Sequence, residues 1–201
     1  MLSGFGLGAG VIFVVTLAVS IAGLYSPKVI AKTILRPYYV ARNGEWARLV
    51  TSGFVHADFG HLIFNMITFY FFAFPLERAI GTARFVVLYF VGLVLSDLGT
   101  YFKRRNDPDY ASLGASGAIL AVLFAFIVYF PDQRLMFVLI PIPIPAPLFA
   151  VGYLAYSYYF SRRPIGRINH DAHIGGALTG LAFVALTDPG AYRRLLAMIT
   201  N

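Results

Sequence analysis

The chain has 201 residues, of which 59% are hydrophobic and 12% charged, and it carries a formal net charge of +7. Soluble domains are roughly 45–50% apolar and about 25% charged, so this composition excludes an ordinary soluble domain and predicts a polytopic membrane protein. The absence of cysteine excludes a disulfide framework and thiolate catalysis. The basic residues lie in short clusters between apolar runs, so we expect contact with the lipid bilayer rather than with nucleic acid.

Apolar stretches recur along the chain at lengths suited to crossing a bilayer. In chain order we expect spans at about 4–25, 59–76, 85–102, 114–131, 147–161 and 172–187. These spans use most of the length, so residues 1–201 are expected to form a single all-α membrane domain. Between the fourth and fifth spans, prolines at alternate positions remove backbone donors, so we expect a hairpin there rather than a continuous helix.

The connection between the first two spans, residues 27–58, is too long for an ordinary turn. It mixes apolar residues such as Ile30, Tyr38 and Trp46 with lysines and arginines. Apolar side chains that lie in lipid, with cationic groups directed toward phosphate, account for this mixture. We therefore expect a long first loop at the membrane interface.

Polar residues gather at the entrances of the second, fourth and sixth spans. His61 and Asn65 are four residues apart, so a helix places them on one face. Ser116 opens the fourth span, and His170 and His173 open the sixth. Alternate spans run in the same direction, so these entrances share one face of the bundle. Polar groups within a bilayer face the protein interior or water, and the sequence therefore predicts one polar site.

A serine among small residues has two interpretations, helix packing and nucleophilic catalysis. Gly176 and Gly180 follow His173 on its own helical face, and Gly117 follows Ser116. Small residues let membrane helices approach closely, so the packing would itself bring the hydroxyl to the imidazole. Nucleophilic catalysis needs such a hydroxyl and base, together with donors for the oxyanion that develops.

Three motifs at these entrances belong together. They are His56-x4-His61-x3-Asn65, Gly114-Ala-Ser116-Gly117 and Ala172-His173-x2-Gly176-x3-Gly180. With them the chain resembles, over nearly its whole length, the rhomboid family of intramembrane serine proteases. The resemblance implies a six-helix bundle and a Ser-His dyad that cleaves peptide bonds in or beside transmembrane segments. The substrates would be single-span or multi-span membrane proteins, and neither a cofactor nor a metal ion is implied.

The resemblance also assigns roles to individual residues. Ser116 would be the nucleophile and His173 the general base. The side chains of His61 and Asn65, with the Ser116 backbone amide, would hold the oxyanion. The resemblance gives the remaining matched residues a structural role or a place near the site. They are His56, Gly114, Gly117, Gly176, Gly180, Arg48 and Glu77.

One departure from the family concerns the histidine. Some members place a tyrosine four residues after the nucleophile, against the catalytic histidine, where this chain has Leu120. We therefore expect aliphatic packing to orient the His173 ring. His56 keeps two interpretations, packing at the interface or a role near the substrate.

Three polar residues near the site receive no role. Asp97 and Asp171 have the chemistry to complete a triad, but the family works with a dyad. We expect Asp97 to pair with a nearby lysine or arginine, and His170 to be a loop residue beside the base.

The positive charges and the family resemblance predict opposite orientations. Of the 16 Lys and Arg residues, eleven lie on the face of the site and five on the other. The eleven are Lys28, Lys32, Arg36, Arg42, Arg48, Lys103, Arg104, Arg105, Arg162, Arg163 and Arg167. This excess would turn the site toward the cytoplasm. Because the first loop is expected to be interfacial, we follow the family and expect an extracytoplasmic site in a bacterial inner membrane.

Two other classes of function remain open. An inactive rhomboid-like protein would bind membrane helices without cutting them, although the presence of both Ser116 and His173 is unfavourable to it. A small channel or transporter would need a polar path to the other face. The second, fourth and sixth spans are almost wholly apolar beyond their first turns. The sequence specifies neither the natural substrate nor the oligomeric state.

Overall fold

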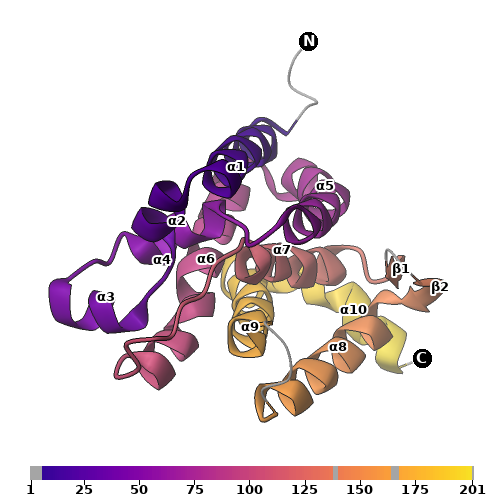
Figure 1. Ribbon diagram of the computed structural model, residues 1–201. Helices are drawn as coiled ribbons and strands as arrows, with labels where there is room; N and C mark the ends of the chain where they lie inside the picture. Colours follow the sequence, from indigo (N-terminus) through magenta and orange to yellow (C-terminus); the bar gives the residue numbers. More distant parts are fainter. Residues whose placement is uncertain (1–5, 138–139, 164–167, 201) are drawn as a thin grey trace.

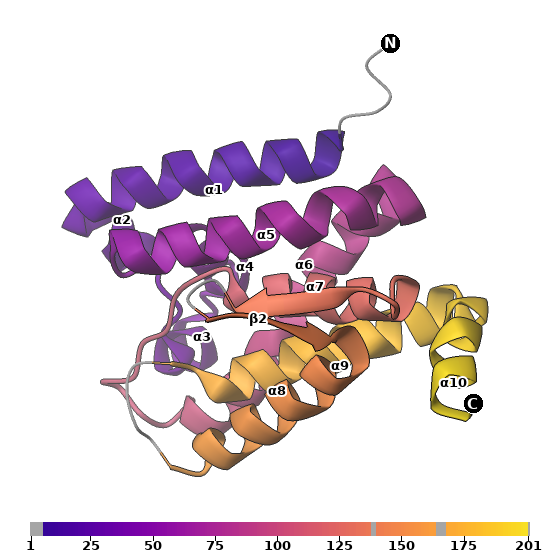
Figure 2. The ribbon, with the colours of Figure 1, turned by 90° about the vertical axis from the view of Figure 1, so that its right-hand side faces the viewer.

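The computed structural model describes residues 6–137, 140–163 and 168–200, most of which are helical. The long helices are α1 (Leu7–Tyr25), α5 (Phe59–Ile80), α6 (Thr82–Arg104), α7 (Ser116–Tyr129), α8 (Ala146–Ser161) and α9 (His170–Thr187). They form a bundle with α7 at its centre, in contact with α5, α6 and α9 (Figure 1). In the view of Figure 2, α1 and α5 lie on one side of the bundle and α8 and α9 on the other.

Helix α7 is buried on all sides because its sequence has no polar face. Every side chain of residues 117–128 is buried. A helix that is apolar all round is stable only where neighbours surround it. Its 14 residues rise about 21 Å, less than the roughly 30 Å hydrocarbon core of a bilayer. A helix this short cannot place both of its ends at the membrane surfaces.

Three of the described helices, α1, α5 and α6, are long and apolar enough to cross a membrane. Helix α9 meets the C-terminal segment at a bend of 107°, and the count is four if this pair is one span. That segment contains α10 (Tyr192–Thr200). Helices α7 and α8 have 14 and 16 residues, which is short for a full span. Helix length alone therefore gives fewer spans than the six expected.

The helix ends differ from the expected spans by a few residues. Helix α5 continues to Ile80, beyond the expected end at residue 76, and it carries Glu77 in a buried position. Helix α6 begins directly after Gly81, whose φ of +83° forms the tight turn between the two helices. Residues 4 and 5 of the first expected span lie outside the described residues.

The connection between α1 and α5 is itself folded. It contains α2 (Pro27–Thr33), α3 (Pro37–Asn43), α4 (Arg48–Thr51) and the 3-10 turn Ser52–Phe54. Arg48 holds the segment together because its Nη1 donates to the carbonyl oxygens of Ala31, at 2.9 Å, and Ile34, at 2.8 Å. Its Nε also pairs with Glu45. The arginine thereby joins α2 to α4.

The segment between α7 and α8 is a two-stranded antiparallel sheet, so the all-α prediction is incomplete. Strand β1 (Arg134–Phe137) pairs with β2 (Ile140–Pro145), and Leu135 lies opposite Ile144. Backbone N–H groups at alternate positions of a strand point to the same edge. Next to Pro145, the Ala146 N–H donates to the Gln133 carbonyl oxygen at 2.9 Å, so the missing donor of Pro145 lies on the edge away from β1, where a strand tolerates proline.

The carboxylate of Glu77, near the end of α5, binds the start of α1. Its Oε1 accepts hydrogen bonds from the Gly8 N–H at 2.9 Å and from Thr82 Oγ1 at 2.7 Å, and its Oε2 accepts one from the Ala9 N–H at 2.7 Å. The first turn of α1 has no side-chain cap of its own. A negative charge satisfies these free N–H groups and is favourable at a helix N-terminus. Glu77 thus joins α1, α5 and α6.

Replacing Glu77 by alanine is expected to lower the free energy of unfolding by about 3 kcal/mol, because buried donors lose a charged acceptor. Chemical unfolding of the purified protein in detergent measures this loss. Glu45→Ala is the matched control, since it breaks a partly exposed ion pair and should leave the free energy of unfolding close to the wild-type value. Equal losses in the two variants would contradict the role of Glu77 as the cap of α1.

Candidate active site

The Ser116 hydroxyl and the His173 imidazole meet inside the bundle. Ser116 is the first residue of α7, and His173 lies in the first turn of α9. The Nε2 atom of His173 is 2.9 Å from Ser116 Oγ, which is a hydrogen-bond distance. A hydroxyl in contact with an unprotonated ring nitrogen can pass its proton to that nitrogen.

Glycines allow α7 and α9 to approach closely enough for this contact. A Cβ atom built on Gly176 would lie on the carbonyl oxygen of Gly117, and one built on Gly180 would lie on that of Ala121. Backbone atoms cannot turn aside as a flexible side chain does, so any larger residue would push the helices apart. The small residues therefore set the helix separation at which the hydroxyl reaches the imidazole.

The loop that leads into α7 passes over the His61 ring at Gly114. This glycine has a φ of +117°, a conformation that other residues rarely adopt. A Cβ atom there would lie 2.7 Å from His61 Cε1. The Gly114 N–H donates to the carbonyl oxygen of Ser52 at 2.9 Å, which fixes the loop on the segment before α5. Glycine is thus required here both for its conformation and for space.

His61 and Asn65 lie in the first two turns of α5. Asp58 caps this helix by accepting from the His61 N–H at 2.8 Å. The Asn65 Nδ2 donates to the His61 carbonyl oxygen at 3.1 Å, and its second N–H makes no hydrogen bond among the described residues. Both side chains line the same cavity as Ser116. The cavity therefore has polar groups from α5, α7 and α9.

His56 is fully buried and joins three parts of the chain. Its Nδ1 is 2.8 Å from Ser20 Oγ, and its Nε2 accepts from the Ala115 N–H at 3.4 Å. Because Ser20 Oγ donates to the Phe54 carbonyl oxygen, Nδ1 carries the proton of the neutral ring. Burial lowers the pKa of His56 to about 3, so the ring stays neutral. Its contacts fix the backbone just before Ser116.

These side chains lie in a cavity of about 1200 Å³. Its polar lining includes His61, Asn65, Ser116 and His173 at the helix entrances, and also Asp97 of α6 and Tyr153 of α8. Apolar residues of α5, α7 and α8, including Phe72, Leu123 and Phe149, line it elsewhere. The cavity thus combines hydrogen-bonding groups with an apolar surface.

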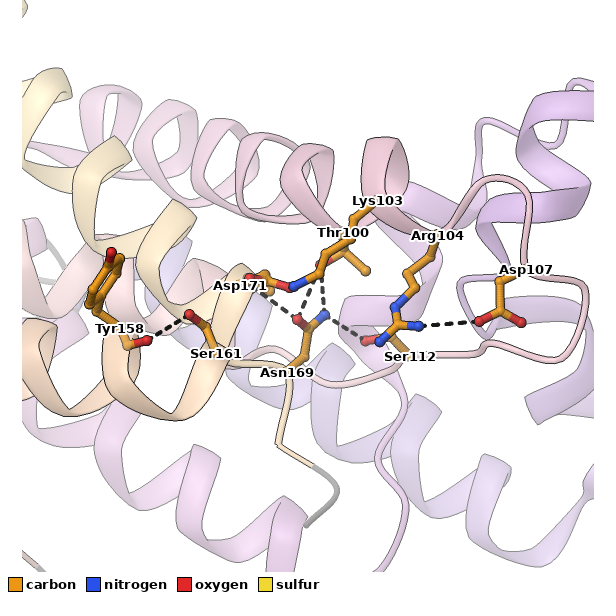
Figure 3. A network of polar contacts seen from close by, with 10 residues as sticks. Thr100, Lys103, Arg104, Asp107, Ser112, Tyr158, Ser161, Asn169 and Asp171 are labelled. Carbon is orange, nitrogen blue, oxygen red and sulfur yellow. Dashed lines mark hydrogen bonds and ion pairs between the residues drawn. The ribbon is translucent and has the colours of Figure 1, made fainter. Parts of the chain in front are cut away.

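A polar network fixes the entrance of α9 beside the cavity (Figure 3). The Asn169 side chain caps α9 by accepting from the Ala172 N–H at 3.1 Å. Its Nδ2 donates to Thr100 Oγ1 at 2.9 Å and to Ser112 Oγ at 3.2 Å. These bonds join the start of α9 to α6 and to the loop before α7. They hold the turn that carries His173.

Among the described residues, Asp97 and Asp171 make no hydrogen bond or ion pair with His173. Asp171 pairs with Lys103 at 2.7 Å (Figure 3). Asp97 forms no ion pair within the described residues, so the expectation of a lysine or arginine partner for it is wrong. The reason is that Lys103 and Arg104, at the end of the same helix, are held by Asp171 and Asp107.

His170 is a buried residue of α9, so the expectation that it lies in a loop is also wrong. Its side chain is packed among aromatic rings: the Phe160 ring stacks on it at 5.7 Å between centroids, and the Tyr156 ring meets it edge-on at 5.6 Å. The His173 ring lies 5.8 Å away. The Nδ1 atom of His170 is buried without a hydrogen-bond partner among the described residues.

A tyrosine from α8 contacts the other nitrogen of His173. Tyr153 Oη is 2.9 Å from His173 Nδ1. The expectation that only aliphatic packing around Leu120 orients this ring is therefore wrong. The sequence signal for Tyr153 is a hydroxyl in the middle of an apolar span, because such a group needs a polar partner.

This fold and site define a class of protein, an apolar helical bundle with a Ser-His pair in an internal cavity. Residues 43–189 match the family model described as Rhomboid domain. The chain therefore belongs to the rhomboid family, whose members are generally intramembrane serine proteases.

Curated relatives carry the same family name. The chain is 42% identical over 94 residues to the putative rhomboid protease YdcA of Bacillus subtilis (strain 168), covering 45% of this chain and 46% of that protein. It is 28% identical over 160 residues to the rhomboid protease GluP of the same organism, covering 78% and 30%. With the mitochondrial presenilin-associated rhomboid-like protein A of Danio rerio it shares 30% identity over 147 residues, covering 68% and 36%. The chain thus spans less than half the length of each of these relatives.

Proposed function

We propose that this protein is an intramembrane serine endopeptidase that cleaves peptide bonds in or next to the transmembrane segments of other membrane proteins. The observation that carries the proposal is the 2.9 Å separation between Ser116 Oγ and His173 Nε2 inside the cavity. Membership of the rhomboid family, and relatives named rhomboid proteases, support the same reaction.

In this reaction His173 Nε2 takes the Ser116 proton as Oγ attacks the carbonyl carbon of the scissile peptide bond. The tetrahedral intermediate collapses when His173 gives the proton to the amine nitrogen, which breaks the C–N bond and leaves an ester on Ser116. Water then gives a proton to His173 and attacks the ester. The ester bond breaks, Ser116 regains its proton, and the carboxyl product leaves. These steps need no cofactor.

The negative charge that develops on the carbonyl oxygen requires donors. We assign this role to the His61 ring, the second N–H of Asn65 Nδ2 and the backbone N–H of Ser116. The Ser116 N–H lies in the first turn of α7, before the first intrahelical hydrogen bond, and a helix N-terminus favours negative charge. All three residues line the cavity.

The lining of the cavity suits a membrane-protein substrate. Its apolar surface can contact the side chains of a transmembrane segment, while the polar groups face a peptide bond and admit the water that hydrolysis consumes. The polar groups assigned to the reaction, His61, Asn65, Ser116 and His173, all lie within the first two turns of α5, α7 and α9. A channel would instead need polar groups that continue to the opposite face.

We assign six membrane spans to α1, α5, α6, α7, α8 and α9, within one domain. Helix α7 need not match the bilayer thickness because protein surrounds it on all sides. The site is placed at the extracytoplasmic face of a bacterial inner membrane. A reporter fused after Asn201 should then be cytoplasmic, and an external reporter would reverse this orientation.

The test is a cleavage assay with purified protein and a labelled single-span membrane protein. The expected result is two fragments whose new termini, mapped by mass spectrometry, lie in or next to the transmembrane segment. Binding of the substrate without cleavage would instead support an inactive rhomboid-like protein. Ion flux across liposomes without cleavage would support a channel.

A further inference from the structure

The Nδ1 atom of His173 is the second functional atom of the imidazole. If Nε2 accepts the Ser116 proton, the neutral ring must carry its own proton on Nδ1. An acceptor at Nδ1 favours that tautomer and also stabilises the imidazolium that forms during the reaction. In a catalytic triad an aspartate has this place. Here Asp97 and Asp171, which line the same cavity, make no hydrogen bond to the His173 ring among the described residues, and Asp171 pairs with Lys103.

The atom at this place is a phenol oxygen. Tyr153 Oη lies 2.9 Å from His173 Nδ1, and the two ring centroids are 6.3 Å apart. The tyrosine ring is itself fixed, since it stacks on Phe149 at 5.9 Å and meets Phe124 edge-on at 6.1 Å. A hydroxyl can accept the Nδ1 proton without placing a charge inside the bundle, where an unpaired carboxylate is costly.

We propose that Tyr153 is the positioning residue of the Ser-His pair: its Oη accepts the Nδ1–H of His173 and holds the ring in the tautomer that leaves Nε2 free for Ser116. This inference rests on the proposed function and extends its machinery, carried by α5, α7 and α9, to α8. The packing of α8 against α9 therefore determines whether His173 is held with Nε2 unprotonated, because the Tyr153 hydroxyl reaches His173 only where these two helices pack together.

Tyr153→Phe removes the hydroxyl and keeps the ring contacts with Phe149 and Phe124. The kcat for a single-span substrate is expected to fall about tenfold, the size of one lost hydrogen bond, while KM stays within about twofold. Tyr156→Phe is the matched control because Tyr156 lies on the same helix and its ring contacts His170. Its kcat should match the wild type. Equal kcat values in the two variants would overturn the proposal.

The tautomer is measured directly by 15N NMR of histidine-labelled protein, with the His173 signal identified by its loss in His173→Ala. The wild type should show a protonated Nδ1 and an unprotonated Nε2, and Tyr153→Phe should show a mixture of tautomers. An unchanged tautomer in Tyr153→Phe would overturn the proposal. This spectrum does not depend on turnover, so a wild type without Ser116-dependent cleavage would count against the proposed function alone.

Discussion

Purified Ser116→Ala protein is expected to lose cleavage of a single-span membrane substrate by about 10⁴-fold or more, down to the background of the assay. The reason is that the proposed nucleophile is removed, and losses of this order follow when a catalytic serine is replaced. Initial rates over a range of enzyme concentrations, measured with a fluorogenic substrate in detergent, give the ratio.

The structure predicts that this variant still folds. Among the described residues the hydroxyl makes one side-chain hydrogen bond, to His173, and α7 begins at Ser116 without a side-chain cap. The free energy of unfolding should therefore change by about 1 kcal/mol or less. Ser26→Ala, at the junction of α1 and α2 and outside the cavity lining, is the serine control and should cleave at the wild-type rate. Full activity in Ser116→Ala would show that Ser116 is not the nucleophile.

The second large effect is expected at His61 and Asn65. Removing either side chain should lower kcat by about a hundredfold with a small change in KM, because a donor to an oxyanion acts in the transition state. Of the substitutions at Asn65, Asn65→Asp is a more specific test than Asn65→Ala. It keeps the shape of the side chain but replaces both N–H donors of Nδ2, including the one bonded to the His61 carbonyl oxygen, with an acceptor, so its loss should equal or exceed that of Asn65→Ala.

A double variant of His61 and Asn65 should lose less than the product of the two single losses, because both donors serve one oxygen. Wild-type kcat in both single variants would return the pair to a structural role, consistent with the hydrogen bond from Asn65 Nδ2 to the His61 carbonyl oxygen. Measuring kcat therefore distinguishes the proposed oxyanion role of Asn65 from its structural hydrogen bond to His61.

The polar site follows from the sequence better than its surroundings do. Helical spacing places His61 with Asn65, and alternating span direction brings them to the end of the bundle where Ser116 and His173 lie. Gly117, Gly176 and Gly180 also predict the close contact between the two helices, because the packing of membrane helices depends on a local pattern of small residues.

The partners of the site could not be predicted because they depend on side-chain directions between distant helices. The ring of His173 meets Tyr153, which is 20 residues away on a helix whose tyrosines follow no diagnostic spacing. Asp97 precedes Lys103 and Arg104 on α6, yet both of these cations pair with other carboxylates. The end of α5 could not be predicted from hydropathy either. Its charged residue Glu77 is buried within the helix, where the carboxylate caps α1.

The most direct test of the central claim, that His173 activates Ser116 as the nucleophile, is covalent labelling with a fluorophosphonate. Mass spectrometry of the labelled protein identifies the modified residue. The structure predicts one adduct on Ser116 that disappears in His173→Ala and persists in His170→Ala. An adduct that forms undiminished without His173, or that depends on His170 instead, would contradict the assignment of the base.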